Sequence, residues 1–203
     1  LPALTAEDLS AMIAKIQAYE AGFGQSWQDQ IVFAADTNDP AAGRFADANA
    51  ELAALVESKH AVDVVDLNAT AIAPARNKLM SYFQSGAGII HYTGHGGVAN
   101  WSGKGLLKAA DVAGMNNTNR PPVVAALSCL VGRYEAPGVN SLGELLVRKN
   151  DGGAVAAWGP SGLSRNDPAK ELGAAFYRAV LQEGAGTLDL HGRRAQEAHA
   201  AVV

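Results

Sequence analysis

Five short apolar runs recur along the chain, each bounded by turn-forming residues. They are rich in Val, Ile and Ala, a composition typical of strands that are buried on both faces of a sheet. The runs are QIVFAAD (30–36), AVDVVDLN (61–68), AGIIHYTGHG (87–96), PPVVAALSC (121–129) and GGAVAAWG (152–159).

Segments with apolar residues at helical spacing alternate with these runs. Asn140 is a good N-cap for one of them, and Asp167 followed by Pro168 starts another, whereas Gly86 and Gly152 are plausible helix stops. The predicted helices cover 6–22, 44–58, 73–86, 140–153 and 167–186.

Strands that alternate with helices predict an α/β fold with a mainly parallel sheet of five or six strands and helices on both faces. We expect a single domain over residues 1–203. Ligands bind such sheets beyond the carboxyl ends of the strands. Those ends carry Asp36, Asn68, His95 with its glycines, Cys129 and the WGPSG segment.

Charge and cysteine content narrow the function classes. The chain has 16 basic and 20 acidic residues, so its net charge of −4 argues against binding to nucleic acid or to an anionic membrane surface. No stretch approaches the roughly 18 apolar residues of a membrane span. The single cysteine, Cys129, excludes an internal disulfide and a metal site with several thiolates.

The first residues, LPALTAEDL, resemble an entry into the middle of a protein. We therefore expect a domain excised from a longer precursor, and we expect that precursor to be secreted or displayed on a bacterial cell surface.

Two of the strand ends carry matched chemistry. His95 lies between Gly94 and Gly96 after the third run, and Cys129 ends the fourth run. If these strands are neighbours, the two side chains lie about 5–10 Å apart at one edge of the sheet. A histidine there can support a thiolate and protonate a leaving amine. The backbone N–H groups of Gly96 and Cys129 could hold the developing oxyanion.

Other interpretations of these residues remain open. A cysteine after VVAAL is more often buried in a core, and a histidine between glycines is often a turn residue. His91, inside its strand, is expected to be structural. The chain lacks the Gly-x-Ser-x-Gly of lipases, a Walker loop, Gly-x-Gly-x-x-Gly and His-Glu-x-x-His. The oxygen-rich segment 36–47 lacks the spacing of a helix–loop–helix calcium loop, but a looser structural calcium site is an alternative.

Four motifs in order resemble the gingipain family of cysteine peptidases, in the caspase-like clan. They are YTGHG with the following Trp101, VVAALSCLVGRY, NSLGELL and GGAVAAWGPSGLS, which together extend over most of the chain from about Gln30 to Ser164. The resemblance implies a caspase-like sheet and a peptidase in which His95 and Cys129 form the catalytic pair. It also implies an acidic residue behind the histidine, and Asp36 matches by position.

The resemblance bears on substrate selection as well. In arginine-specific gingipains a buried Asp selects the basic P1 side chain, and Asp47 lies near the matching position. Trp101 and Trp158 are candidates for pocket walls. The stretch SGLSRNDP lacks the aromatic residue that closes this pocket in the arginine-specific members, and Arg165 would repel a basic substrate if it faced inward.

The function expected from these observations is a gingipain-type cysteine endopeptidase that acts on polypeptides and requires no cofactor. Cys129 attacks the carbonyl, His95 protonates the leaving amine and Asp36 orients His95. A transpeptidase of the same family, which processes secretion signals, would use the same residues. An inactive caspase-like scaffold is the non-enzymatic alternative.

Overall fold

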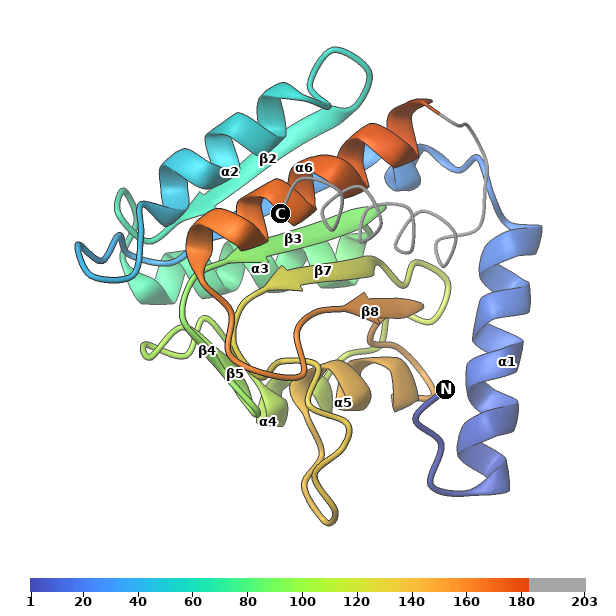
Figure 1. Cartoon of the computed structure of the whole chain (residues 1–203). Helices are drawn as coiled ribbons and strands as arrows, with labels where there is room; N and C mark the ends of the chain where they lie inside the picture. The colour runs from blue at the N-terminus through green and yellow to red at the C-terminus, as the bar shows by residue number, and fades with distance from the viewer. Residues whose placement is uncertain (183–203) are drawn as a thin grey trace.

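The computed structural model describes residues 1–182 and has a sheet of five parallel strands at its centre, in the order β2-β1-β3-β7-β8 (Figure 1). The strands are β1 (Gln30–Ala35), β2 (Ala61–Asp66), β3 (Ile89–Thr93), β7 (Val123–Leu127) and β8 (Ala156–Trp158). Each strand lies within one of the five apolar runs, and all four pairings are parallel. The predicted strands and their direction are therefore confirmed.

Helices cover both faces of the sheet. One face packs against α2 (Phe45–Ala54) and α6 (Asn166–Gln182), and the other packs against α3 (Ile72–Ser85) and α5 (Leu142–Arg148). Successive residues of β1 alternate between the two faces, as a pleated strand requires. Phe33 packs with the α2 and α6 side, whereas Val32 and Ala34 pack with the α3 side.

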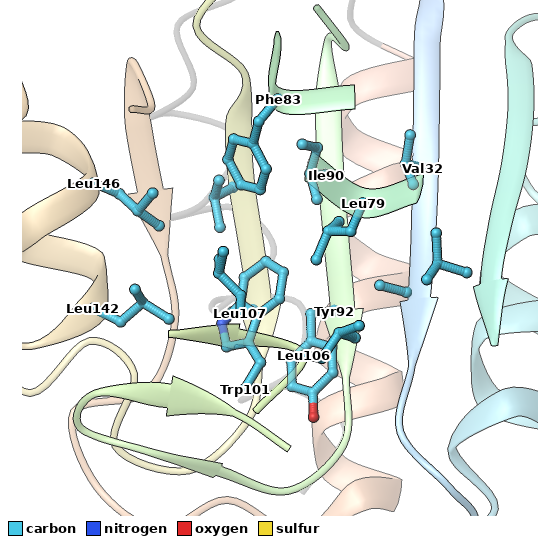
Figure 2. Close-up of a cluster of buried hydrophobic side chains, with 14 of the residues drawn as sticks. Val32, Leu79, Phe83, Ile90, Tyr92, Trp101, Leu106, Leu107, Leu142 and Leu146 are labelled. Atoms are coloured by element: carbon cyan, nitrogen blue, oxygen red, sulfur yellow. The ribbon is translucent and has the colours of Figure 1, made fainter. Parts of the chain in front are cut away.

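The larger of the two cores lies on the α3 and α5 side (Figure 2). Leu79 and Phe83 of α3 and Leu142 of α5 meet the inward residues of β3 in this core. The ring of Tyr92 stacks on Trp101, with centroids 4.7 Å apart. The apolar residues of the central strands are thus buried on both faces, which explains why their sequence shows no polar side.

On the opposite face, His91 of β3 is fully buried beside Phe33 and Tyr177. Its ring nitrogens contact the hydroxyl oxygens of Thr93 (3.0 Å) and Tyr177 (3.1 Å). Burial lowers the pKa of His91 to about 3. The prediction that His91 is structural is confirmed.

Helix α1 (Ala6–Ala21) lies beside α5 at one end of the molecule, where Figure 1 shows it in blue. The buried side chain of Lys15 connects the two helices through hydrogen bonds. Its Nζ donates hydrogen bonds to the carbonyls of Val147, Lys149, Gly152 and Ala154, over 2.6–3.2 Å. This ammonium group satisfies carbonyls that the end of α5 would otherwise leave without donors.

Several helix boundaries differ from those expected. Helix α2 ends at Ala54 rather than Ser58, and α5 ends at Arg148, before the predicted stop at Gly152. Helix α5 is capped by Ser141 rather than Asn140, because Ser141 and Glu144 form a reciprocal capping box. Helix α6 begins at Asn166, since the carbonyl of Arg165 already accepts the N–H of Ala169. The predicted residues of that helix beyond 182 lie outside the described residues.

The remaining elements are short. A small antiparallel sheet, which the hydrophobic pattern does not predict, follows β3 and packs beside its carboxyl end (Figure 1). The strands of this small sheet are β4 (Gly96–Gly97), β5 (Asn100–Trp101) and β6 (Leu107–Lys108). The other short elements are the helix α4 (Ala109–Val112) and the 3-10 helix η1 (Ser26–Asp29). Within residues 1–182 no helix combines the length and apolar character that crossing a bilayer demands.

Candidate active site

The carboxyl ends of β3 and β7 form the centre of the site. These strands are direct neighbours, with Thr93 paired to Leu127, so the segments that follow them leave the sheet side by side. A Cβ atom placed on Gly96 would come within 2.1 Å of Ser128 Oγ and 2.9 Å of the Cys129 carbonyl. The glycine at position 96 therefore allows the His95 loop to lie directly against the Cys129 loop.

His95 and Cys129 line one small pocket of about 30 Å³. The other residues of its lining come from the loop after β1, from the start of α2, from the ends of β3 and β7, and from the segment that enters α6. They are Ala42, Phe45, Gly94, Leu127, Ser164, Arg165 and Asn166. The predicted meeting of His95 and Cys129 at one edge of the sheet is thus observed.

The Cys129 thiol is partly exposed. Its Sγ accepts a hydrogen bond from the Ser164 N–H (3.3 Å) and can donate to the Ser164 carbonyl (3.4 Å). Among the described residues, the Cys129 N–H has no hydrogen-bond acceptor, so it is available to an incoming oxyanion. Leu130 has a φ of 62°, a left-handed conformation that turns the chain sharply after the thiol.

The imidazole of His95 contacts the carboxylate of Asp39, with 2.9 Å between Nε2 and Oδ2. A carboxylate can only accept, so Nε2 carries the proton and Nδ1 is the basic nitrogen. The Ala41 N–H and the His95 imidazole together hold the pKa of Asp39 below its ordinary value. The edge of the His95 ring also packs against Phe45, with centroids 5.3 Å apart.

Asp36 lies behind the histidine but does not touch its ring. Its buried carboxylate accepts hydrogen bonds from the N–H groups of Thr37 and His95, at 2.8 and 3.3 Å. It also accepts from the hydroxyl of Ser102 (2.8 Å). The Tyr92 hydroxyl lies 3.4 Å from this carboxylate and donates its shorter hydrogen bond, at 2.7 Å, to the His95 carbonyl. The expectation that Asp36 orients the imidazole is therefore corrected: Asp36 fixes the backbone of the loop, and Asp39 holds the ring.

Asp39 is held in place by its own turn. Its backbone pairs with Gly43 in both directions, and its Oδ1 accepts the Ala41 N–H at 2.8 Å. Asn68, at the end of β2, supports the same loop by bonding Asn38 and the Asp36 carbonyl. The ends of three neighbouring strands therefore cooperate to position the histidine.

The oxygen-rich segment 36–47 does not gather its carboxylates. Asp36, Asp39 and Asp47 each face separate donors in the protein. Across residues 1–182, no group of three or more His, Cys, Asp and Glu side chains is arranged to hold a metal ion. Within the described residues this loop thus has no carboxylate cluster for the structural calcium ion that was considered as an alternative.

Comparison with known proteins assigns the family. The model of peptidase family C25 matches residues 1–202. The chain belongs to peptidase family C25. No curated protein sequence gives a significant match.

Solved structures share the fold of this C25 chain. The crystal structure of the Arg-specific cysteine proteinase gingipain R (RgpB) superposes with a TM-score of 0.85 at 18% identity, covering 98% of the present chain and 49% of its own. The complex of the Porphyromonas gingivalis RgpB pro- and mature domains gives the same values. A third structure, described as a protease, has a TM-score of 0.74 at 16% identity. The C25 chain spans about half the length of these relatives, and the predicted gingipain resemblance and caspase-like fold are confirmed.

Three expected substrate-binding residues of the C25 chain lie away from the small pocket. Asp47 is exposed and forms an ion pair with Arg44, so it does not sit at the base of a buried pocket. Trp101 is buried in the larger core, and Trp158 stacks on Phe176. Both tryptophans line a second cavity of about 570 Å³ between α1, α5 and β8, and Cys129 is not part of its lining.

Sequence reasoning missed several residues of the C25 site. Asp39 lies three residues beyond the end of the first apolar run, in an Asn-Asp-Pro turn. That turn was the only sequence feature that could have marked Asp39 as part of the site. Ser164 and Asn166 follow the last strand and reach the site through the connection to α6. The Oδ1 of Asn166 is buried and, among the described residues, has no hydrogen-bond donor. Such an unpaired acceptor near the Cys129 thiol could accept the N–H of a bound peptide.

Proposed function

We propose that this C25 chain is the catalytic part of a cysteine endopeptidase in which Cys129 is the nucleophile, His95 transfers the proton and Asp39 orients His95. The observation that carries the proposal is the shared pocket. His95 and Cys129 line it together at the carboxyl ends of adjacent parallel strands. Polypeptides are the proposed substrates, and the proposed location is outside the cell or on its surface.

The first half of the reaction forms a thioester. Nδ1 of His95 takes the proton of the Cys129 thiol, while Asp39 stabilises the resulting imidazolium through Nε2–H. The sulfur attacks the peptide carbonyl carbon, and the carbonyl π electrons move to oxygen. The Cys129 N–H, with the Gly96 N–H as its partner, stabilises that oxyanion. When the tetrahedral intermediate collapses, the C–N bond breaks and His95 protonates the departing amine.

The second half restores the thiol. A water molecule gives a proton to the neutral imidazole of His95 and attacks the thioester carbon. The C–S bond then breaks, the carboxylic acid leaves, and the sulfur recovers its proton. All of these steps use groups of the chain itself and ask for no cofactor.

A library of internally quenched peptides tests the proposal. The purified chain should cleave members of the library, and Cys129→Ala should lower kcat by at least about 1,000-fold. His95→Ala should cause a similar loss. Equal cleavage by the native chain and Cys129→Ala would attribute the activity to a contaminant and remove the proposal.

The alternative functions give different products. With an added amine nucleophile, mass spectrometry should find mainly the free carboxylic acid, whereas a transpeptidase would transfer the acyl group to the amine. A scaffold without turnover would show no cleavage and slow labelling of Cys129 by iodoacetamide near neutral pH.

A further inference from the structure

The carbonyl oxygen of His95 accepts two hydrogen bonds from within the protein. The Tyr92 hydroxyl donates one at 2.7 Å, and the Ser102 N–H donates the other at 2.8 Å. The peptide bond from His95 to Gly96 is trans, so this carbonyl and the Gly96 N–H point in opposite directions within one plane. The two donors on the oxygen therefore also fix the direction of the Gly96 N–H, which the proposed reaction uses to bind the oxyanion.

The pairing of the small outer sheet does not hold this N–H. Gly96 lies opposite Trp101 in the antiparallel pair of β4 and β5. The adjacent hydrogen bond runs from the Ser102 N–H to the His95 carbonyl. Gly96 and Trp101 are therefore a non-hydrogen-bonded pair, in which the N–H of each residue points away from the other strand. The direction of the Gly96 N–H thus depends on what holds the carbonyl at the other end of its peptide group.

Tyr92 has little freedom of position beneath the loop that carries His95. Its ring is fully buried and stacks on Trp101, with 2° between the ring planes. Figure 2 shows the two rings side by side, with the Tyr92 hydroxyl oxygen (red) at the edge of the cluster. A Cβ atom on Gly94 would come within 2.5 Å of that oxygen, so the hydroxyl fits under the loop because residue 94 has no side chain.

The Tyr92 hydroxyl keeps the proton that it donates. Its oxygen lies 3.4 Å from the carboxylate of Asp36, which accepts the N–H of His95 at 3.3 Å. Burial, and then the negative charge of Asp36, raise the pKa of Tyr92 well above its ordinary value. Asp36 and Tyr92 thus hold the two backbone polar groups of His95, the N–H and the carbonyl.

We propose that Tyr92 is a positioning residue for the oxyanion site: its hydroxyl fixes the plane of the peptide group between His95 and Gly96 and so aims the Gly96 N–H at the developing oxyanion. The inference rests on the endopeptidase function proposed above. Tyr92 is not part of the lining of the small pocket and acts through the peptide group rather than on the substrate.

Tyr92→Phe tests the proposal, because it removes the hydroxyl and keeps the stacked ring. The oxyanion exists only along the path of the reaction, so the variant should lower kcat at least about 10-fold and leave KM within about twofold of the native value. Alkylation of Cys129 by iodoacetamide forms no oxyanion, so its rate should stay within about twofold. Tyr177→Phe is the matched control: it removes a buried hydroxyl that contacts His91 on the opposite face of the sheet, and both rates should stay unchanged.

Amide NMR supplies a second readout that does not depend on turnover. A hydrogen bond to a carbonyl polarises the whole peptide group. Loss of the Tyr92 hydroxyl should therefore move the amide nitrogen resonance of Gly96 in Tyr92→Phe, whereas Tyr177→Phe should leave that resonance in place.

The outcomes separate this inference from the proposed function. If Tyr92→Phe cleaves peptides with the native kcat, or if its alkylation by iodoacetamide slows as much as its kcat falls, the inference is overturned and the peptidase assignment stands. An unmoved Gly96 resonance in Tyr92→Phe would overturn it in the same way. Absence of cleavage by the native chain would reject the proposed function and this inference together.

Discussion

Chemically alike side chains in this chain have different environments, and we assign structural roles to some and proposed catalytic roles to others. Asp36 and Asp39 lie three residues apart in one loop, yet Asp36 is buried and accepts hydrogen bonds from two backbone N–H groups and a hydroxyl, whereas Asp39 contacts the imidazole. His91 and His95 lie four residues apart, yet the first is enclosed in the core and the second borders the pocket. Position relative to the end of the strand decides which role each residue takes.

Replacement of the two carboxylates should therefore have different effects. Asp39→Asn removes the charge that stabilises the imidazolium, so we expect kcat to fall about 100-fold with little change in the free energy of unfolding. Asp36→Asn leaves buried donors poorly matched and should cost about 2 kcal/mol in that free energy. Peptide cleavage and urea unfolding measure the two quantities, and a larger loss of stability in Asp39→Asn than in Asp36→Asn would contradict the assignment.

The lowered pKa of Asp39 has a consequence for acid solutions. Because the carboxylate stays ionised below its ordinary pKa, its contact with His95 is lost only when the pH falls through that lowered value.

His91 makes the whole fold sensitive to acid. Its pKa of about 3 in the folded chain lies below the 6.5 expected when unfolded, so the unfolded state binds more protons between these values and stability rises with pH. Between pH 7 and pH 5 we expect the free energy of unfolding to fall by about 2 kcal/mol from this residue. Urea unfolding of His91→Gln should show a correspondingly flatter pH dependence, and His60→Gln, at a half-buried surface position, is the comparison. Parallel curves for the native chain and His91→Gln would refute this account.

Among the elements, the short segment from β3 to β4 has a strict steric condition that lies at the site itself. A side chain at Gly96 would collide with Ser128 Oγ and the Cys129 carbonyl, and these belong to the loop that carries the proposed nucleophile. A side chain at position 96 would therefore disturb the site and not the central sheet.

Gly96→Ala should lower kcat/KM by more than about tenfold, because a displacement near 1 Å is enough to misplace reacting groups. The global fold should persist, since β4 belongs to the small outer sheet. Gly103→Ala is the matched control in the same region, where an added Cβ meets no atom within 4 Å. Unchanged activity of Gly96→Ala would show that the two loops can separate without loss of function.

Some elements and site residues could be predicted from the sequence, whereas others could not. The central strands were predictable because their short runs are rich in Val, Ile and Ala. The pair His95 and Cys129 followed from the rule that parallel strands end at one edge. Asp39 could not be found in the same way, because its approach to the ring depends on the backbone pairing of Asp39 with Gly43. The positions of Trp101 and Trp158 could not be predicted either, because the sequence does not distinguish an aromatic residue that lines a pocket from one that packs in a core.

At the scale of the whole molecule, the charged side chain of Lys15 connects α1 to the segment that follows α5. Lys15 reaches from α1 to the carbonyls beyond α5, so the position of α1 depends on this contact as well as on apolar packing. The buried Met12 lies on the same face of α1.

Lys15→Met should lower the free energy of unfolding by about 3 kcal/mol, because it leaves carbonyls without donors at the end of α5. Lys59→Met, at an exposed turn, should change it by less than about 0.5 kcal/mol. Urea unfolding of both variants provides the comparison. Equal stability of the two variants would mean that solvent replaces the ammonium group at no cost.

The strand order has a consequence for engineering. All the groups assigned to the reaction stand where β1, β3 and β7 finish, and the opposite rim of the sheet contributes none of them. The connection before β7 contains the exposed Thr118 and Asn119 on that opposite rim. A peptide tag or a guest domain inserted between them would therefore leave the reaction centre untouched, so this scaffold offers an attachment point on the side remote from its chemistry.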